Sequence, residues 1–308
     1  MKTKGQITAA LLVAALGAAG CSRTGETQTS SQGSQGQTTP VSMTTESSAR
    51  PPVADKVVIG PVSFADGEAA YRAGNYRKAA DVFEQYTKQQ PDNAWGHFMY
   101  GLSASRSGDP AKAGLAFEEA LRIDPDHVKS LTNLSRVLID QRRLDEAFEK
   151  LTHAVEIEPN SPEVHRLLGR AYNAQGKTED AVEAYRRAIE LDDKDAWSMN
   201  NLGLLFLERG RPNDALPLLA RAVLLKKDVA MFHNNLGMAL EHTGRFAAAT
   251  MAYNGALNAE PGYTKAQKNL ERVQAVKVGS EEPFDLEALA GGHSEQTQKQ
   301  ADETTPDN

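Results

Sequence analysis

Three histidines are the residues of this chain whose type and spacing could do chemistry. His97, His165 and His233 occupy one position of a pattern that recurs every 34 residues, and imidazoles in register can hold a metal ion. Apolar residues at helical spacing surround each histidine, so packing between helices explains these positions and metal binding is not needed to explain them. The chain has no HExxH pair, glycine-rich phosphate loop or nucleophile elbow. We therefore expect no enzyme, no catalytic residue, no metal, no cofactor and no small-molecule substrate.

The single cysteine, Cys21, is the other reactive candidate. It follows a segment with the layout of a secretory signal peptide: Lys2 and Lys4, an apolar run over residues 7–16, and then small residues. The run is shorter than the roughly 20 residues that span a bilayer, and no other stretch approaches that length. We expect residues 1–20 to be the signal peptide and the mature protein to have no transmembrane helix. Without a second cysteine, the thiol cannot form a disulfide within the chain.

The residues before Cys21 resemble the bacterial lipobox, in which a small residue precedes a cysteine that receives diacylglycerol. Ala19 and Gly20 match this pattern, while Ala18 stands where leucine is more common. The resemblance implies an exported protein that is lipid-anchored to the cell envelope through Cys21. Ser22, in place of aspartate after the cysteine, implies the outer membrane facing the periplasm rather than the inner membrane. The alternative is an ordinary signal peptide, cleaved nearby, with a free thiol.

Composition divides the rest of the chain into a tether, a body and a tail. Residues 21–59 are dominated by Ser, Thr, Gln, Gly and Pro, which predicts a disordered tether with a reach of about 35 Å. Residues 278–308 contain eight acidic residues and one lysine, and the rest of the chain has 33 acidic and 33 basic residues. The net charge of −7 therefore lies in an acidic tail, which we expect to be disordered. A neutral body argues against nucleic acid as a partner, because phosphate contacts need an excess of Lys and Arg.

Three ladders of residues with a period of 34 define the body. The glycine ladder consists of Gly74, Gly108, Gly176, Gly210 and Gly244, with Arg142 on the remaining rung. The alanine ladder consists of Ala79, Ala113, Ala147, Ala181, Ala215 and Ala249. The proline ladder consists of Pro91, Pro125, Pro159 and Pro261. The ladders predict six units, over residues 60–93, 94–127, 128–161, 162–195, 196–229 and 230–263, followed by a capping helix over 264–277.

Each unit resembles the tetratricopeptide repeat (TPR), a family motif of two helices. The fourth unit has Leu168, Gly169 and Tyr172 at positions 7, 8 and 11, followed by Ala181 and Tyr185 at positions 20 and 24. The resemblance implies an all-α fold, in which helix-turn-helix TPR hairpins form an α-solenoid wound as a right-handed superhelix. The lipobox extends the resemblance to bacterial TPR lipoproteins. The first unit departs most from the pattern, so its boundary is the least defined.

The spacing of the residues supports the same fold independently. Positions 4, 7, 8 and 11 form one stripe of a first helix, and positions 20, 24 and 27 form one stripe of a second helix. Small residues at positions 8, 20 and 27 let the two backbones approach, and glycine at position 15 supplies the left-handed conformation that ends the first helix. Each hairpin exposes apolar surface until a neighbour stacks on it, which favours a solenoid.

A second stripe of the first helix, at positions 2, 5, 9 and 12, faces away from the partner helix. In the TPR family this stripe lines a concave groove, which binds a peptide or a partner helix. The predicted partner-binding residues are Trp95, Phe98, Leu102, Lys129, Arg136, Arg166, Arg170, Asn173, Trp197, Asn200, Leu204, Met231, Asn234 and Met238. Apolar residues flank a basic centre, so we expect a partner with acidic residues and apolar anchors. The alternative is that the apolar residues are buried between units and the arginines are solvated.

The layout suggests a membrane-tethered scaffold or adaptor of the bacterial envelope, such as a pilus or secretion-system assembly factor. One alternative is an adaptor for periplasmic proteases or peptidoglycan enzymes. Another is a non-catalytic accessory of a glycosyltransferase, because Asn133, Asn201, Asn235 and Asn269 resemble the asparagine ladder of O-linked N-acetylglucosamine transferase. The acidic and apolar tail segment EEPFDLEALAGG could bind the groove weakly, or it could only solubilise the protein.

Lipidation gives the first prediction. Mass spectrometry of the mature protein is expected to find an acylated N-terminal Cys21, because the small residues before it form the processing site. Cys21→Ser is expected to block processing or to release the protein from membranes. A soluble wild-type product that begins at another residue would contradict the prediction.

Overall fold

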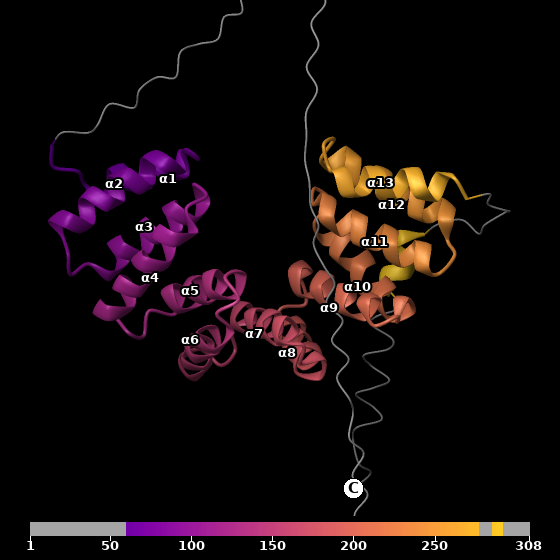
Figure 1. The fold of residues 1–308 in the computed structure, drawn as a ribbon, viewed down its shortest axis with the longest axis horizontal. Coiled ribbons are helices and arrows are strands. Elements are labelled where there is room, and N and C mark those ends of the chain that lie inside the picture. The colour runs from indigo at the N-terminus through magenta and orange to yellow at the C-terminus, as the bar shows by residue number, and fades with distance from the viewer. Residues whose placement is uncertain (1–59, 277–284, 292–308) are drawn as a thin grey trace, which may run out of the picture. The chain divides into compact units, whose positions relative to one another are not determined.

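The computed structural model of this chain describes residues 60–276 and 285–291, and within them it contains helices and no strand. The first helices of the six units are α1 (Phe64–Arg72), α3 (Ala94–Arg106), α5 (Val128–Asp140), α7 (Pro162–Gln175), α9 (Ala196–Glu208) and α11 (Ala230–His242). The second helices are α2 (Tyr76–Gln89), α4 (Pro110–Ile123), α6 (Leu144–Ile157), α8 (Thr178–Leu191), α10 (Pro212–Leu225) and α12 (Phe246–Ala259). A further helix, α13 (Thr264–Gln274), follows the last hairpin (Figure 1).

Local capping signals fix where several helices begin. The side chain of Asn93 accepts a hydrogen bond from the backbone N–H of Gly96 at 2.8 Å, which caps α3. Asp109 caps α4 in the same way through Lys112, and Pro110 occupies the first helical turn, where its missing N–H is not needed. The helix starts therefore follow from residue types that the sequence already displays.

All six hairpin turns share one left-handed residue at position 15. The five ladder glycines have φ between 70° and 88°, and Arg142 adopts the same conformation with φ 61°. In the fourth unit the N–H of Gly176 donates to the carbonyl of Asn173, and the N–H of Lys177 donates to that of Tyr172, each at 3.0 Å. The equivalent pair of hydrogen bonds closes each of the other five turns.

Small residues allow the two helices of each hairpin to pack closely. All six ladder alanines at position 20 are fully buried. A Cβ atom on Gly169 would lie 2.6 Å from the ring of Tyr185, and one on Gly237 would lie 2.5 Å from the ring of Tyr253. The ring at position 24 thus occupies the space that a side chain at position 8 would need.

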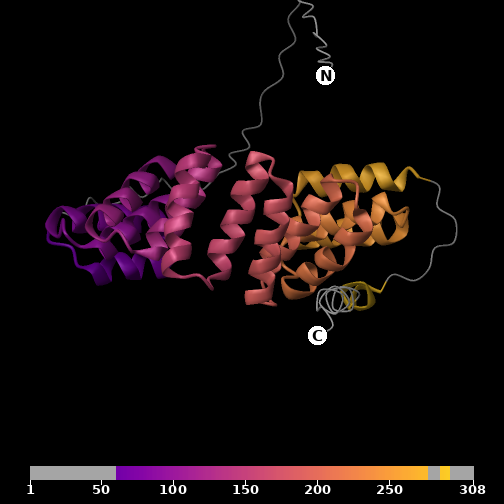
Figure 2. The same cartoon turned by 90° about the horizontal axis from the view of Figure 1, so that it is seen from below.

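The hairpins stack in chain order, and each second helix packs on the next first helix. First helices of neighbouring units also contact each other from α3 onward, so they line the inner side of the stack (Figures 1 and 2). The apolar core forms an N-terminal cluster, whose last buried residues lie in α7, a C-terminal cluster, whose first buried residues lie in α8, and a small cluster that joins α11, α12 and α13. The two large clusters meet in the fourth unit, where α7 and α8 pack closely on each other.

Helix α13 covers the last hairpin. Its buried residues are Ala266 and Val273, and its outer face is polar. Arg272 donates to both carboxylate oxygens of Glu241, at 2.8 and 2.7 Å, and this pairing holds the pKa of Glu241 below its usual value. The hydroxyl of Tyr253 donates to the same carboxylate at 2.7 Å. This network ties α13 to the sixth unit.

The all-α solenoid of TPR hairpins that the sequence predicts is confirmed. None of the helices in the described ranges is both long and apolar enough to cross a bilayer. The predicted signal peptide, Cys21, the predicted tether up to residue 59 and most of the acidic tail lie outside the described residues. Within the tail, residues 286–291 form a short helix, whereas disorder was expected there.

Close helix packing predicts opposite effects for two glycine substitutions. Gly169→Ala is expected to lower the free energy of unfolding by about 1–3 kcal/mol, because the new Cβ would collide with the Tyr185 ring. Gly114→Ala is expected to raise it by about 0.5–1 kcal/mol, because alanine is the better helix former. A Cβ on Gly114 would have only Val137 within 4 Å, at 3.7 Å. Urea denaturation measures both effects, and equal effects for the two variants would refute the packing argument.

The left-handed backbone conformation of Arg142 leads us to expect that glycine at this position would stabilise the protein. Arg142→Gly is expected to raise the free energy of unfolding by about 0.5–1 kcal/mol, because removing the strain outweighs the greater unfolded-state entropy of glycine. Gly176→Arg, on the next rung, is expected to lower it, since its Cβ meets no atom within 4 Å and only the backbone cost applies. Thermal melts should separate the two variants by several degrees, with wild type between them. A lower melting point for Arg142→Gly than for wild type would contradict the strain.

Candidate peptide-binding groove

An aromatic patch lies at the N-terminal end of the predicted groove. The Trp95 side chain is 39% exposed, and its ring centroid lies 5.0 Å from that of Phe98 and 5.4 Å from that of His127. The Lys129 ammonium lies 4.9 Å from the centre of the Trp95 ring, a cation–π contact. Burial lowers the pKa of His127. Phe98 is itself buried in the core, so it supports Trp95 from behind instead of facing the solvent.

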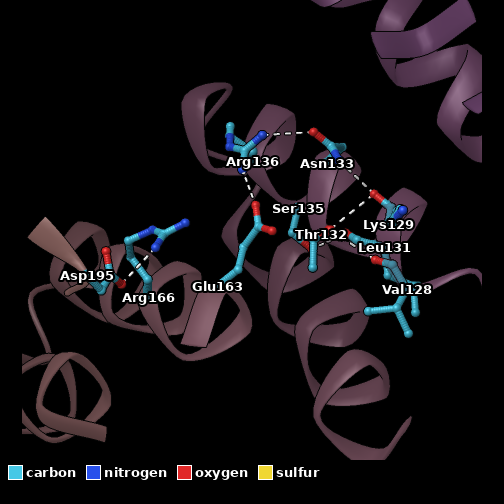
Figure 3. Close-up of polar contacts among 10 residues, drawn as sticks. All are labelled: Val128, Lys129, Leu131, Thr132, Asn133, Ser135, Arg136, Glu163, Arg166 and Asp195. Carbon is cyan, nitrogen blue, oxygen red and sulfur yellow. Dashed lines mark hydrogen bonds and ion pairs between the residues drawn. The ribbon is translucent and has the colours of Figure 1, made fainter. Parts of the chain in front are cut away.

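The predicted basic centre carries its own counter-charges (Figure 3). Arg136 donates through Nη2 to Oε1 of Glu163 at 2.5 Å and through Nη1 to the amide oxygen of Asn133 at 2.8 Å. Arg166 donates through Nη1 to Oδ2 of Asp195 at 2.7 Å. Each ion pair joins the first helix of one unit to the N-terminal end of the next unit's first helix. The arginines are therefore neither free nor fully solvated, and their positive potential is largely offset.

Asp195 connects that ion pair to the second aromatic patch. The carboxylate is buried, and its Oδ1 accepts from the backbone N–H groups of Trp197 and Ser198, both at 3.2 Å, which caps α9. Its Oδ2 accepts from the Ser198 hydroxyl at 2.5 Å as well as from Arg166. A buried carboxylate with this many donors fixes the start of α9, and Trp197 with it.

The C-terminal aromatic patch is built around Trp197. This side chain is 41% exposed, and its ring meets Phe232 edge-on at 4.9 Å between centroids. Met231 and Met238 are half-buried against the core beside it. Two exposed tryptophans at position 2 thus stand on α3 and α9, with the ion-paired centre between them in the chain.

The asparagines of the groove bond to one another. Asn269 donates to the side-chain oxygen of Asn234, and Asn235 donates to that of Asn200, each at 2.9 Å. Asn200 then donates to Asn201 at 3.4 Å. Asn200 and Asn234 are buried, so their side chains connect neighbouring first helices and offer nothing to a ligand. Both residues belong to the predicted partner-binding set, and the structure places them in contacts between helices.

A cavity of about 500 Å³ opens on the first helices of the third, fourth and fifth units. Its walls are Ile139, Asp140, Arg142, Arg170, Asn173, Ala174, Tyr185, Asn201, Leu204 and Glu208. Arg170 donates through Nη2 to Oδ1 of Asp140 at 2.7 Å, and Asn173 is exposed. Tyr185 forms the floor, and burial raises the pKa of its hydroxyl. Arg170, Asn173 and Leu204 had been predicted to line the groove, whereas Arg142, Tyr185 and Asn201 had not.

A larger cavity, of about 880 Å³, surrounds α8 and reaches Phe206 of the next unit. Four glutamates or aspartates and four arginines line it, and Arg187 pairs with Glu190 there at 3.2 Å. Both cavities border the fourth unit. Sequence reasoning missed the larger cavity, because its walls come from helix faces whose residues the repeat pattern does not specify.

The three aligned histidines make one shared structural contact. Nε2 of His97, His165 and His233 lies 3.0, 2.9 and 2.9 Å from the backbone carbonyl six residues earlier in the chain. A carbonyl can only accept, so this nitrogen carries the proton and donates. No group of three or more His, Cys, Asp or Glu side chains within the described ranges could hold a metal ion.

The described part of the tail contacts the C-terminal cluster. Asp285 caps the helix 286–291 by accepting from the N–H groups of Glu287 and Ala288, at 2.9 and 3.0 Å. Leu286 and Leu289 pack against the cluster of apolar residues from α8 to α13. Neither acidic side chain of this segment, within the described residues, pairs with a groove arginine. Within residues 285–291, apolar side chains make this contact, and neither carboxylate pairs with the basic centre.

Stacked helical hairpins with a groove on the inner helices define an interaction scaffold of the helical-repeat class. The chain belongs to the tetratricopeptide repeat family. Family profiles described as TPR repeat or tetratricopeptide repeat match residues 64–128, 104–171, 169–210 and 200–264, which together run from 64 to 264 without a gap. No curated protein sequence matches the chain.

Solved structures share the fold at low sequence identity. A chain of the Cut9–Hcn1 hetero-tetramer of APC/C is 18% identical, with a TM-score of 0.61, over 67% of this chain and 41% of that one. A tetratricopeptide repeat protein from Parabacteroides merdae is 13% identical, with a TM-score of 0.59, over 68% and 81%. A thermophilic TPR protein from Thermus thermophilus is 20% identical, with a TM-score of 0.53, over 60% and 100%. This chain spans less than half of the Cut9–Hcn1 chain, and the likenesses concern the fold.

Proposed function

We propose that this protein is a membrane-tethered adaptor of the bacterial envelope, which holds a peptide or helix of a partner protein in the groove of its first helices. The observation that carries the proposal is the pair of exposed tryptophans, Trp95 and Trp197, on equivalent positions of α3 and α9. Large aromatic side chains are frequent anchors of protein interfaces and are seldom left open to solvent without use. The lipobox resemblance supports the tether.

Rigid support of the two tryptophans favours binding over accidental exposure. Trp95 rests on Phe98 and His127, and Trp197 rests on Phe232 beside the buried Asp195 cap. A side chain held in place loses little conformational freedom when a partner covers it. Because the arginines between them are paired with acids, apolar anchors supply the affinity of the groove and the charges supply its register.

The proposed assembly is of the pilus or secretion-system type, and an adaptor for periplasmic proteases or peptidoglycan enzymes is the second candidate. A substrate-presenting accessory of a glycosyltransferase has less support. That idea drew on the asparagine ladder, of which Asn235 is buried and donates to Asn200, while Asn269 donates to Asn234. Tetratricopeptide repeat proteins are typically non-catalytic, which agrees with an adaptor.

Site-specific photocrosslinking in the native cells tests the groove. Trp95→p-benzoylphenylalanine and Trp197→p-benzoylphenylalanine are each expected to give a discrete crosslinked band in the membrane fraction, since both side chains face the proposed partner. Mass spectrometry of that band identifies the partner and separates the two candidate pathways.

Exposed apolar residues on second helices provide the matched control. Leu115 on α4 is 68% exposed and Met251 on α12 is 58% exposed. The same photoreactive residue at these two positions is expected to give no shared band. A band from Leu115 or Met251 with none from either tryptophan would place the partner on the outer surface and overturn the groove.

A further inference from the structure

Arg142 adopts a backbone conformation that its residue type disfavours. Among the described residues it is the one non-glycine with a positive φ, 61°, and the five equivalent rungs are all glycine. A Cβ on any of those glycines would have no atom within 4 Å, so the backbone alone selects glycine there. Glycine would relieve the strain at no steric cost. Strain of this kind persists where the side chain has a use, so its side chain calls for an explanation.

Local structure does not supply that explanation. The Nη1 group of Arg142 donates to the backbone carbonyl of Ala174 at 3.3 Å, a long bond at an exposed site. The carbonyl lies in the last turn of α7, so the bond caps that helix, but its length and exposure make it weak. Within the described ranges Arg142 forms no ion pair, whereas Arg136, Arg166 and Arg170 each hold a carboxylate. Arg142 therefore brings to the 500 Å³ cavity a guanidinium that holds no carboxylate directly.

We propose that Arg142 binds a carboxylate of the bound partner peptide and that the cavity is the specificity pocket for this group. A guanidinium offers a planar pair of N–H donors that matches a carboxylate, and Asn173 adds an exposed amide on the facing helix. Ile139 and Leu204 supply apolar wall for the adjoining methylene groups. The proposal rests on the proposed function, because it assumes a peptide in the groove.

The other charges of the cavity select a carboxylate over a phosphate. Asp140 and Glu208 also line it, and Asp140 is held by Arg170. Two fixed negative charges repel a dianion more strongly than a monoanion. The guanidinium of Arg142, which holds no carboxylate directly, is enough to bind a single carboxylate. That group can come from a Glu or Asp side chain or from the C-terminus of the peptide.

Three pools of randomised eleven-residue peptides distinguish the sources of the carboxylate. One pool carries a fixed central glutamate and an amidated end, one a central glutamine and an amidated end, and one a central glutamine and a free C-terminal carboxylate. Each pool is bound to the full mature wild-type protein and to Arg142→Gly, Arg142→Lys and Gly176→Arg, and retained peptides are counted. Gly176→Arg is the matched control, because it places the same side chain on the next rung.

Wild type is expected to enrich one of the carboxylate pools over the glutamine-amide pool by about tenfold, the ratio that one specific charge-assisted contact gives. Arg142→Gly is expected to abolish this preference while melting above wild type, and Arg142→Lys to retain part of it. Gly176→Arg is expected to keep the preference while melting below wild type. Loss of binding together with a gain in stability cannot result from unfolding.

The other outcomes separate this inference from the proposed function. Equal retention of all three pools by wild type would overturn the carboxylate pocket and leave the peptide groove standing. Retention of none of the pools would overturn both. An unchanged preference in Arg142→Gly would show that another residue binds the carboxylate, and a lower melting point in that variant would show that Arg142 is a structural cap.

Discussion

The close approach of two helices within each hairpin is the constraint on which the structure depends. Alanine at position 20 is fully buried in all six units, and glycine at position 8 makes room for the aromatic ring that fills the hairpin in four of them. This packing fixes the orientation of each first helix about its own axis. The stripe that faces the groove is therefore the stripe left over when the hairpin interior is filled. Core packing therefore decides which face of each first helix lines the groove. The choice of partner depends on the residues of that face that are not buried in the core.

Hydrogen bonds and ion pairs between helices of neighbouring units have two roles. Arg136 and Arg166 each pair with an acid at the N-terminal end of the next first helix, and the asparagine side chains join α9, α11 and α13. These contacts help to hold neighbouring hairpins together. The ion pairs also offset positive charge that could otherwise attract a ligand. The groove has clustered arginines in the sequence, but in the structure carboxylates offset most of their charge. Arg142 differs because no carboxylate among the described residues accepts from it.

The fourth unit is the place where the stack is least continuous. Its own two helices pack closely, but the contacts of α6 with α7 and of α8 with α9 are less extensive than those between the other hairpins, and both cavities border this unit. At the other junctions a change in the angle between hairpins would expose more buried surface. A partner that spans both tryptophans would have to match the angle at this junction.

The sequence by itself determined the hairpins, their period and their caps, because these depend on residues that interact within about one unit. The glycine and alanine ladders predicted every turn, and Arg142 stood out as the exception on its rung. The sequence also marked both exposed tryptophans. It could not show that Phe98, Asn200 and Asn234 are buried, since their neighbours lie in other helices, or that the arginines are paired. Only the tertiary structure decided those points, because the distance between charges on neighbouring units depends on how the hairpins stack.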